Sequence, residues 1–284
     1  MKLERLAELD LSAASGLVHH GGWLYAVADD GIALLRTDLV GANPKWLPLT
    51  DGPRVATIPK DTKPDFEALL FSRGELVAMG SGSSAARRLA VSINPEGGAR
   101  RTIDLRPLYA ALDRRVHELN IEGAVISGDD VFLAQRGNGS RRENALIRLD
   151  RACFEVELAA GALTEASVRE LVPVQLGALG GVALSLTDLC LGSGGELLFT
   201  AAAEATDNPY EDGVVAGSII GAIDRRGHVD DDQLVVVERV KLEGVCWLES
   251  QELRLVADPD DPTAHAPLFR LAWPPQGPAT GLGL

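Results

Sequence analysis

The sequence predicts an all-β fold, a single five-bladed β-propeller of four-stranded antiparallel blades. The first observation is a repeat: a polar residue opens an apolar run, and a second apolar run begins nine or ten residues later, five times along the chain. The second is the interval of 52 to 66 residues between openers, which suits one four-stranded blade. The openers are Ser15, Glu67, Glu122, Asp188 and Glu243.

The third observation concerns the two ends of the chain. Fourteen residues precede the first opener and 42 run from the last opener to the end, and together they have the length of one more blade. We therefore expect residues 1–14 to complete the last blade and so close the ring. The domain spans 1–284, and the proline- and glycine-rich stretch 275–284 is expected to be a loose tail.

Each repeat contains short apolar segments bounded by turn residues, which predict strands. In chain order these strands are 16–18, 23–27, 33–36 and 45–49; 68–71, 75–79, 89–93 and 101–105; 124–126, 131–134 and 145–149; 189–191, 197–200 and 218–223; 245–247, 253–256 and 268–273, with 3–10 last in the ring. Helical segments are expected at 108–115, after Pro107, and at 164–171, where the longest interval has spare length.

Composition excludes several classes of function. The chain carries 27 basic and 41 acidic residues, a net charge of −14, which disfavours nucleic-acid and anionic-membrane partners. It has no apolar stretch long enough to span a membrane, and its first residues do not resemble a signal peptide. The three cysteines are far apart, which indicates a reducing, cytoplasmic location rather than disulfides or a zinc site.

The ring closure brings the openers together at one mouth of the central channel. A second ring lies 14 or 15 residues further on, at Asp29, Ser81, Arg136, Ala202 and Asp258. Two carboxylates about 6 Å apart repel by roughly 3 kcal/mol at an effective dielectric constant near 20, so four of them need compensation. A divalent cation, for which we expect calcium, would be bound by Glu67, Glu122, Asp188 and Glu243. Pairing with Arg136, Lys63, Lys241, Arg88 or backbone amides is the second possibility, and protonation of one carboxyl group is the third.

Two segments carry a family resemblance. Ile121-Glu122-Gly123 and Leu242-Glu243-Gly244-Val245-Cys246-Trp247 resemble the Glu-Gly-x-x-Trp opening of gluconolactonase/regucalcin-type propellers, and are similar to segments of phytase-like and SdiA-regulated propellers. The resemblance implies acidic residues around a central metal, usually calcium. Glu67 matches loosely and Asp188 only in position. The lactonase group has six blades, one more than expected here, and the chain also resembles uncharacterised bacterial propellers.

Other polar residues are candidates for contact with a small polar ligand at the channel mouth: Ser15, Asp29, Lys63, Ser81, Arg136 and Asp258. Arg136 either binds an anionic part of the ligand or pairs with a channel carboxylate. His117 and His265 are candidates for a general base. The sequence contains neither a Gly-x-Ser-x-Gly elbow nor a His-Glu-x-x-His motif.

Two hypotheses of function follow. In the first, the cation assists hydrolysis of an ester, lactone or phosphoester. In the second, the protein is a non-catalytic binding or scaffold propeller whose channel carboxylates are held by internal salt bridges. The absence of a recognisable nucleophile favours the second hypothesis, and the residue pattern at the openers favours the first.

Overall fold

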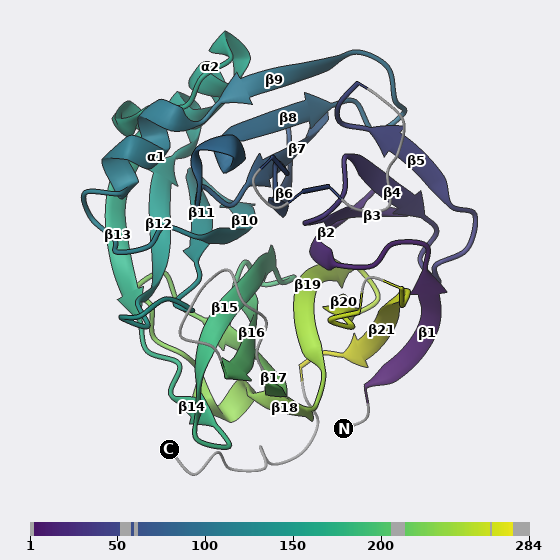
Figure 1. Cartoon of the computed structure of the whole chain (residues 1–284). Coiled ribbons are helices and arrows are strands. Elements are labelled where there is room, and N and C mark those ends of the chain that lie inside the picture. Colours follow the sequence, from purple (N-terminus) through teal and green to yellow (C-terminus); the bar gives the residue numbers. More distant parts are fainter. Residues whose placement is uncertain (1–2, 52–57, 60–61, 206–213, 262, 275–284) are drawn as a thin grey trace.

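The computed structural model describes residues 3–51, 58–59, 62–205, 214–261 and 263–274. The stretch 275–284, expected to be a loose tail, lies outside these residues. Five antiparallel sheets surround a central axis, so the predicted five-bladed propeller is confirmed (Figure 1).

In each blade, the first of the four main strands lies nearest the axis (Figure 1). Blade 1 contains β2 (Ala14–His20), β3 (Trp23–Ala28), β4 (Ala33–Thr37) and β5 (Lys45–Pro48). Blade 2 contains β6 (Phe66–Ser72), β7 (Glu75–Gly80), β8 (Leu89–Ile93) and β9 (Arg100–Asp104). Blade 3 contains β10 (Ile121–Ser127), β11 (Asp130–Gln135), β12 (Asn144–Asp150) and β13 (Val168–Val174).

The last two blades depart from a plain run of four consecutive strands. Blade 4 contains β15 (Val182–Leu191), β16 (Leu197–Ala205), β17 (Val214–Ile223) and β18 (Val235–Glu238), with the short β14 (Ala178–Leu179) added beside β15. Blade 5 contains β19 (Lys241–Leu248), β20 (Glu252–Asp258) and β21 (Ala266–Ala272), and its outer strand is β1 (Glu4–Leu9).

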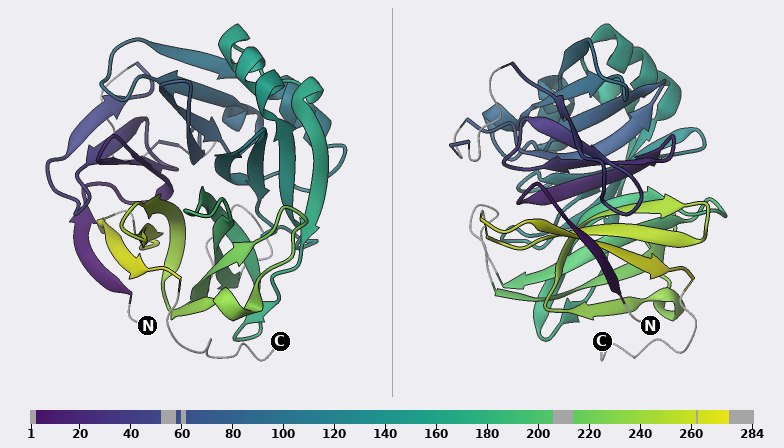
Figure 2. Two further views of the ribbon diagram at one scale, coloured as in Figure 1. Left: turned by 180° about the vertical axis from the view of Figure 1, so that it is seen from behind. Right: turned by 90° about the vertical axis from the view of Figure 1, so that its right-hand side faces the viewer.

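The N-terminal strand closes the ring as the sequence predicts. β1 pairs antiparallel with β21, so the first and last described strands lie side by side, purple beside yellow in both views of Figure 2. Leu9 is buried in the cluster that also contains Leu17, Leu24 and Leu268. The pairing therefore joins two ends of the chain through both backbone hydrogen bonds and a shared core.

The helical segments match the prediction in part. Helix α1 (Arg106–Leu112) falls where 108–115 was expected, and the hydroxyl of its buried Tyr109 donates to the carbonyl of Gly80. The predicted helix at 164–171 is wrong: Glu165–Ser167 is a single 3-10 turn, and β13 follows at once. The extra residues of this longest interval instead form α2 (Arg151–Ala160). The side chain of Asp150 caps this helix by accepting a hydrogen bond from the backbone amide of Cys153.

The core lies between neighbouring sheets rather than on the axis. Five clusters of buried apolar residues fill these spaces, and each combines residues from the facing surfaces of adjacent blades. Valine, leucine, isoleucine and alanine supply most of these side chains, as the low aromatic content of 5% requires. In the part of the chain that the structure describes, no helix is long and apolar enough to cross a membrane.

Candidate functional site

Each inner strand has an irregularity near its first residues, and these irregularities hold the first ring of the site. The pairing of the inner strand with the next strand shifts by a residue or two at Ser15-Gly16, Glu67, Glu122, Thr187 and Glu243. A β-bulge re-aims the side chain of its extra residue. The fourth member of the ring is therefore Thr187, and the predicted equivalence of Asp188 with the three glutamates is wrong.

Asp188 instead holds three strands together at the axis. Its carboxylate accepts hydrogen bonds from the backbone amides of Leu17 on β2 (3.4 Å), Val245 on β19 (2.9 Å) and Leu189 on its own strand (2.8 Å). Burial raises the pKa of Asp188, and the three amides oppose that rise. Compensation by backbone amides, one of the possibilities the sequence left open, is thus realised at this residue.

The second ring lies at the positions that the sequence predicts, beside a third ring that the repeat pattern did not predict. The third ring stands two residues before each bulge residue, and its members are Ala13, Asp65, Asn120, Ser185 and Lys241. The rings are joined by backbone hydrogen bonds or strand pairing: the amide of Ser81 donates to the carbonyl of Asp65, and Lys241 pairs with Asp258. Side chains two residues apart on a strand point to the same side, and this rule would have identified the third ring.

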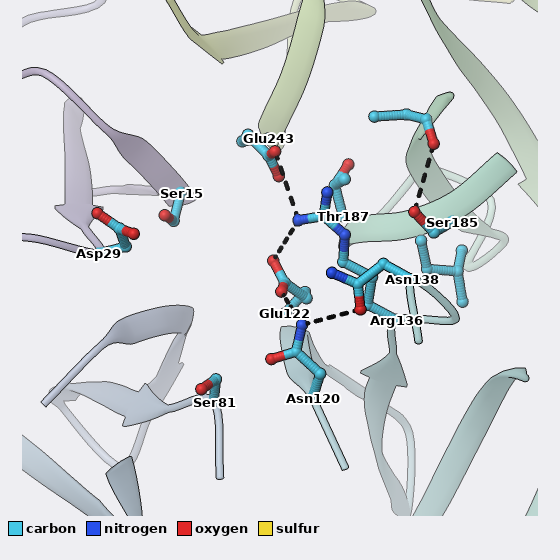
Figure 3. Close-up of polar contacts among 12 residues, drawn as sticks. Ser15, Asp29, Ser81, Asn120, Glu122, Arg136, Asn138, Ser185, Thr187 and Glu243 are labelled. Atoms are coloured by element: carbon cyan, nitrogen blue, oxygen red, sulfur yellow. Dashed lines mark hydrogen bonds and ion pairs between the residues drawn. The ribbon is translucent and has the colours of Figure 1, made fainter. Parts of the chain in front are cut away.

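Arg136 lies at the centre of one polar cluster (Figure 3). Its Nη2 lies 2.8 Å from Oε2 of Glu204, and its Nη1 lies 3.3 Å from Oε2 of Glu122 and 3.6 Å from Oε1 of Glu243. The side-chain amide of Asn120 donates a hydrogen bond to Oε1 of Glu122 at 2.6 Å. Arg136 is 6% exposed, and its predicted pairing with channel carboxylates is confirmed.

Lys241 extends this cluster toward the surface. Its Nζ lies 3.1 Å from Asp258, 2.9 Å from Asp260, 3.5 Å from Glu243 and 4.0 Å from Glu204. Burial raises the pKa of Glu243 to about 8, although Arg136 and Lys241 oppose the rise. Among the described residues, five carboxyl groups share two cations here, and the nearby charges of Glu122 and Asp258 add to the rise in the pKa of Glu243.

A second polar cluster lies around blades 1 and 2. One carboxylate oxygen from each of Asp29, Asp65 and Glu67 lies within 4.8 Å of the other two. Lys63 Nζ bridges two of them, 2.5 Å from Asp29 and 2.9 Å from Asp65. Asp65 also accepts from Arg87 at 2.7 Å and from the hydroxyl of Ser81 at 2.5 Å. When all three carboxyl groups are ionised, they exceed the two cations among the described residues, Lys63 and Arg87, by one charge.

Glu67 is the member of this cluster with the least compensation. Among the described residues no lysine or arginine lies within ion-pair distance of it, and its neighbour is the hydroxyl of Ser15. Burial, with the negative charges of Glu122, Asp65 and Asp29, raises the pKa of Glu67 well above its ordinary range. Burial likewise raises the pKa of Asp29 to about 6. Glu67 is thus positioned either to bind a cation or to hold a proton.

Three residues proposed from the sequence have contacts outside these clusters. His117 lies 3.2 Å from Glu118, and His265 lies 3.1 Å from the carbonyl of Leu9. Both side chains are about half exposed, and neither contacts a ring carboxylate among the described residues. Arg88, considered as a partner for the channel carboxylates, pairs with Asp113 instead.

Known structures show similarity of fold. A luciferin-regenerating enzyme is 13% identical, with a TM-score of 0.52 over 99% of this chain and 96% of that one. A putative gluconolactonase is 11% identical, with a TM-score of 0.44 over 94% and 91%. A hydrazine synthase chain from Kuenenia stuttgartiensis is 12% identical, with a TM-score of 0.42 over 88% of this chain and 57% of its own length.

These identities are too low to transfer an activity. The expected likeness to gluconolactonase-type propellers is confirmed as a likeness of fold by the luciferin-regenerating enzyme. The sequence matches no curated protein. The model of a family of unknown function, DUF6929, matches residues 10–272, so the protein belongs to that family.

Proposed function

We propose that the protein binds a divalent cation, calcium in the first place, between Asp29, Asp65 and Glu67. The observation that supports this most directly is the convergence of three carboxylates, with oxygens within 4.8 Å of one another, around a Glu67 that has no ion pair among the described residues. Hard oxygen ligands of this kind suit calcium, which takes about six to eight of them, including waters and carbonyls.

This set replaces most of the four ligands proposed from the sequence. Glu122 and Glu243 already have Arg136 and Lys241 as partners, and Asp188 has three backbone amides. Only Glu67 belongs to both sets. The two polar clusters therefore have different roles in the proposal: one binds the cation, and the other supports the structure around it.

We extend the proposal to a small polar ligand at the same end of the axis. A bound cation would supply Lewis-acid chemistry there, polarising a carbonyl oxygen or activating water for hydrolysis of an ester or lactone. A phosphoester fits this proposal poorly, because Arg136 and Lys63 are already paired with carboxylates and the surroundings are negative. A neutral substrate is the better fit. A panel of lactones and esters, assayed with wild type and Glu67→Gln, tests this extension.

The salt bridges of Arg136 and Lys241 favour a second candidate, a non-catalytic propeller held together by internal ion pairs. On this hypothesis Glu67 is protonated and no metal is needed. The two candidates differ in one property that can be measured directly, which is whether the purified protein responds to calcium.

The test is metal analysis of the purified protein and melting scans with calcium and with a chelator. We expect calcium to raise the melting temperature of wild type by several degrees, since a ligand that binds only the folded state stabilises it. Glu67→Gln should melt like wild type in chelator and lose the response to calcium. Glu75→Gln, at the far end of the same hairpin, is the matched control and should keep it. A metal-free wild type that melts identically under both conditions refutes cation binding.

A further inference from the structure

Lys63 occupies the position that a bound cation would need. Its ammonium nitrogen lies 2.5 Å from an oxygen of Asp29 and 2.9 Å from one of Asp65, so it contacts two of the three proposed ligands. The side chain is 9% exposed, which means that protein rather than solvent surrounds it. The site thus already contains a cation, and that cation is covalently attached to the chain.

Charge balance shows why a tethered ammonium and a divalent ion are incompatible here. With all three carboxyl groups ionised, as cation binding requires, and with Lys63 and Arg87 in place, the described residues of the site keep one uncompensated negative charge. A divalent ion added to that arrangement would make the site positive. With the ammonium withdrawn, the carboxylates and Arg87 leave two negative charges, which a divalent ion neutralises.

We infer that Lys63 is a built-in competitor of the proposed metal site: a divalent cation binds tightly only when the Lys63 ammonium leaves Asp29 and Asp65. This inference rests on the proposed function, and it assigns the residue that sets its affinity and its charge selectivity. While Lys63 stays in place, the site favours at most a single positive charge. Lys63 is then a residue that tunes specificity, in place of the ligand contact predicted from the sequence.

Calorimetric titration of the chelator-treated full chain with calcium chloride tests the inference. Lys63→Met removes the ammonium and keeps the apolar stem, so calcium should bind at least tenfold more tightly than to wild type, because one nearby repelling charge is gone. Lys63→Arg keeps the charge and should bind no more tightly than wild type. Lys45→Met, which removes a lysine exposed on β5, is the control for net charge and should match wild type.

A combined variant checks that any gain arises at this site. Lys63→Met with Glu67→Gln should lose the gain, because it lacks one of the three ligands. Melting scans give a second readout: in chelator Lys63→Met should melt below wild type, since Asp29 loses its cation, and calcium should reduce the difference. Lys63→Gln, which can still donate to one carboxylate, replaces Lys63→Met if the latter folds poorly.

The outcomes separate this inference from the proposed function. If wild type binds calcium and Lys63→Met binds it no more tightly than Lys45→Met, the competition is refuted and the metal site stands. If neither wild type nor Lys63→Met binds calcium, the metal site itself is refuted and the inference falls with it. If calcium binds only after Lys63 is replaced, competition is supported, and the native protein is a salt-bridged propeller.

Discussion

Glu243 shows how a single buried carboxyl group can set the pH dependence of stability. It is 4% exposed and faces Arg136, Lys241, Glu122 and Asp258. Its pKa rises from 4.5 to about 8 on folding, so between these values the folded state binds more protons than the unfolded state. The free energy of unfolding therefore falls as pH rises through this window, by up to about 1.4 kcal/mol per pH unit for one proton.

We predict that Glu243→Gln flattens this dependence. The glutamine cannot titrate, so urea unfolding between pH 6 and pH 8 should show a smaller loss of stability than in wild type. The control is Glu252→Gln, which lies on β20 at the turn of the β19–β20 hairpin, far from Glu243 near the start of β19. This variant should keep the wild-type slope. Parallel curves for Glu243→Gln and wild type would show that Glu243 does not titrate in this range.

The sequence predicted some residues of the site and missed others for identifiable reasons. Asp188 fits the repeat pattern because it is acidic and lies nine residues before Leu197, the offset found in the first three repeats. Thr187 lies ten residues before Leu197, which is the same offset as from Glu243 to Leu253, so the spacing fits Thr187 equally well. Asp65 was missed because it precedes the apolar run. The pairing of Lys63 with Asp65 depends on side-chain packing that no spacing in the sequence reveals.

At the scale of the strand, the bulge and the glycine beside it act together to bring neighbouring inner strands close. Gly16, Gly123 and Gly244 follow the bulge residue in three blades, and the neighbouring inner strand lies almost against them. A Cβ atom on Gly244 would lie 2.3 Å from the carbonyl oxygen of Ser15, and one on Gly123 would lie 2.8 Å from the Cα of Asp188. These glycines let the inner strands approach closely enough to bring the rings together.

We predict that Gly244→Ala destabilises the protein by about 2–3 kcal/mol, since the methyl group would press on backbone that cannot move freely. Gly31→Ala is the control, because its added methyl would meet its nearest neighbours at 3.3 Å, and it should cost less than about 1 kcal/mol. Urea unfolding at fixed pH measures both. Equal stability of Gly244→Ala and wild type would mean that the inner strands can separate without cost.

The helical segments show where prediction at this scale reaches its limit. Thr164 accepts a hydrogen bond from Ala166 and caps a turn, as a helix start would. The chain then enters β13 because the edge of β12 is open at that point and needs a fourth strand. Local preference began the helix, and the pairing requirement of the blade ended it after one turn, which a local pattern cannot show.

At the scale of the whole molecule, five similar sheets form a ring, and one of them, blade 5, combines strands from the two ends of the described chain. Repeat spacing predicted this arrangement, because the incomplete first and last units add up to a blade. Every other blade is built from consecutive strands, so its strands stay close even when it is partly unfolded. Blade 5 depends on β1 returning from the start of the sequence to β21. The stability of the ring should therefore be most sensitive here.

We predict that Leu9→Ala lowers the free energy of unfolding by about 2–4 kcal/mol, because Leu9 is 3% exposed and packs in the cluster shared by β1, β21 and blade 1. Arg5→Ala, on the exposed side of the same strand, is the control and should change the free energy of unfolding by less than about 0.5 kcal/mol.

Deleting residues 1–9 removes the strand altogether and leaves β21 as an unpaired edge, which favours aggregation. Hydrogen exchange of the deletion variant should show the amides of β21 and β20 losing protection before those of blades 2 and 3. Uniform loss of protection across all five blades would mean instead that the ring unfolds as one unit wherever it is opened.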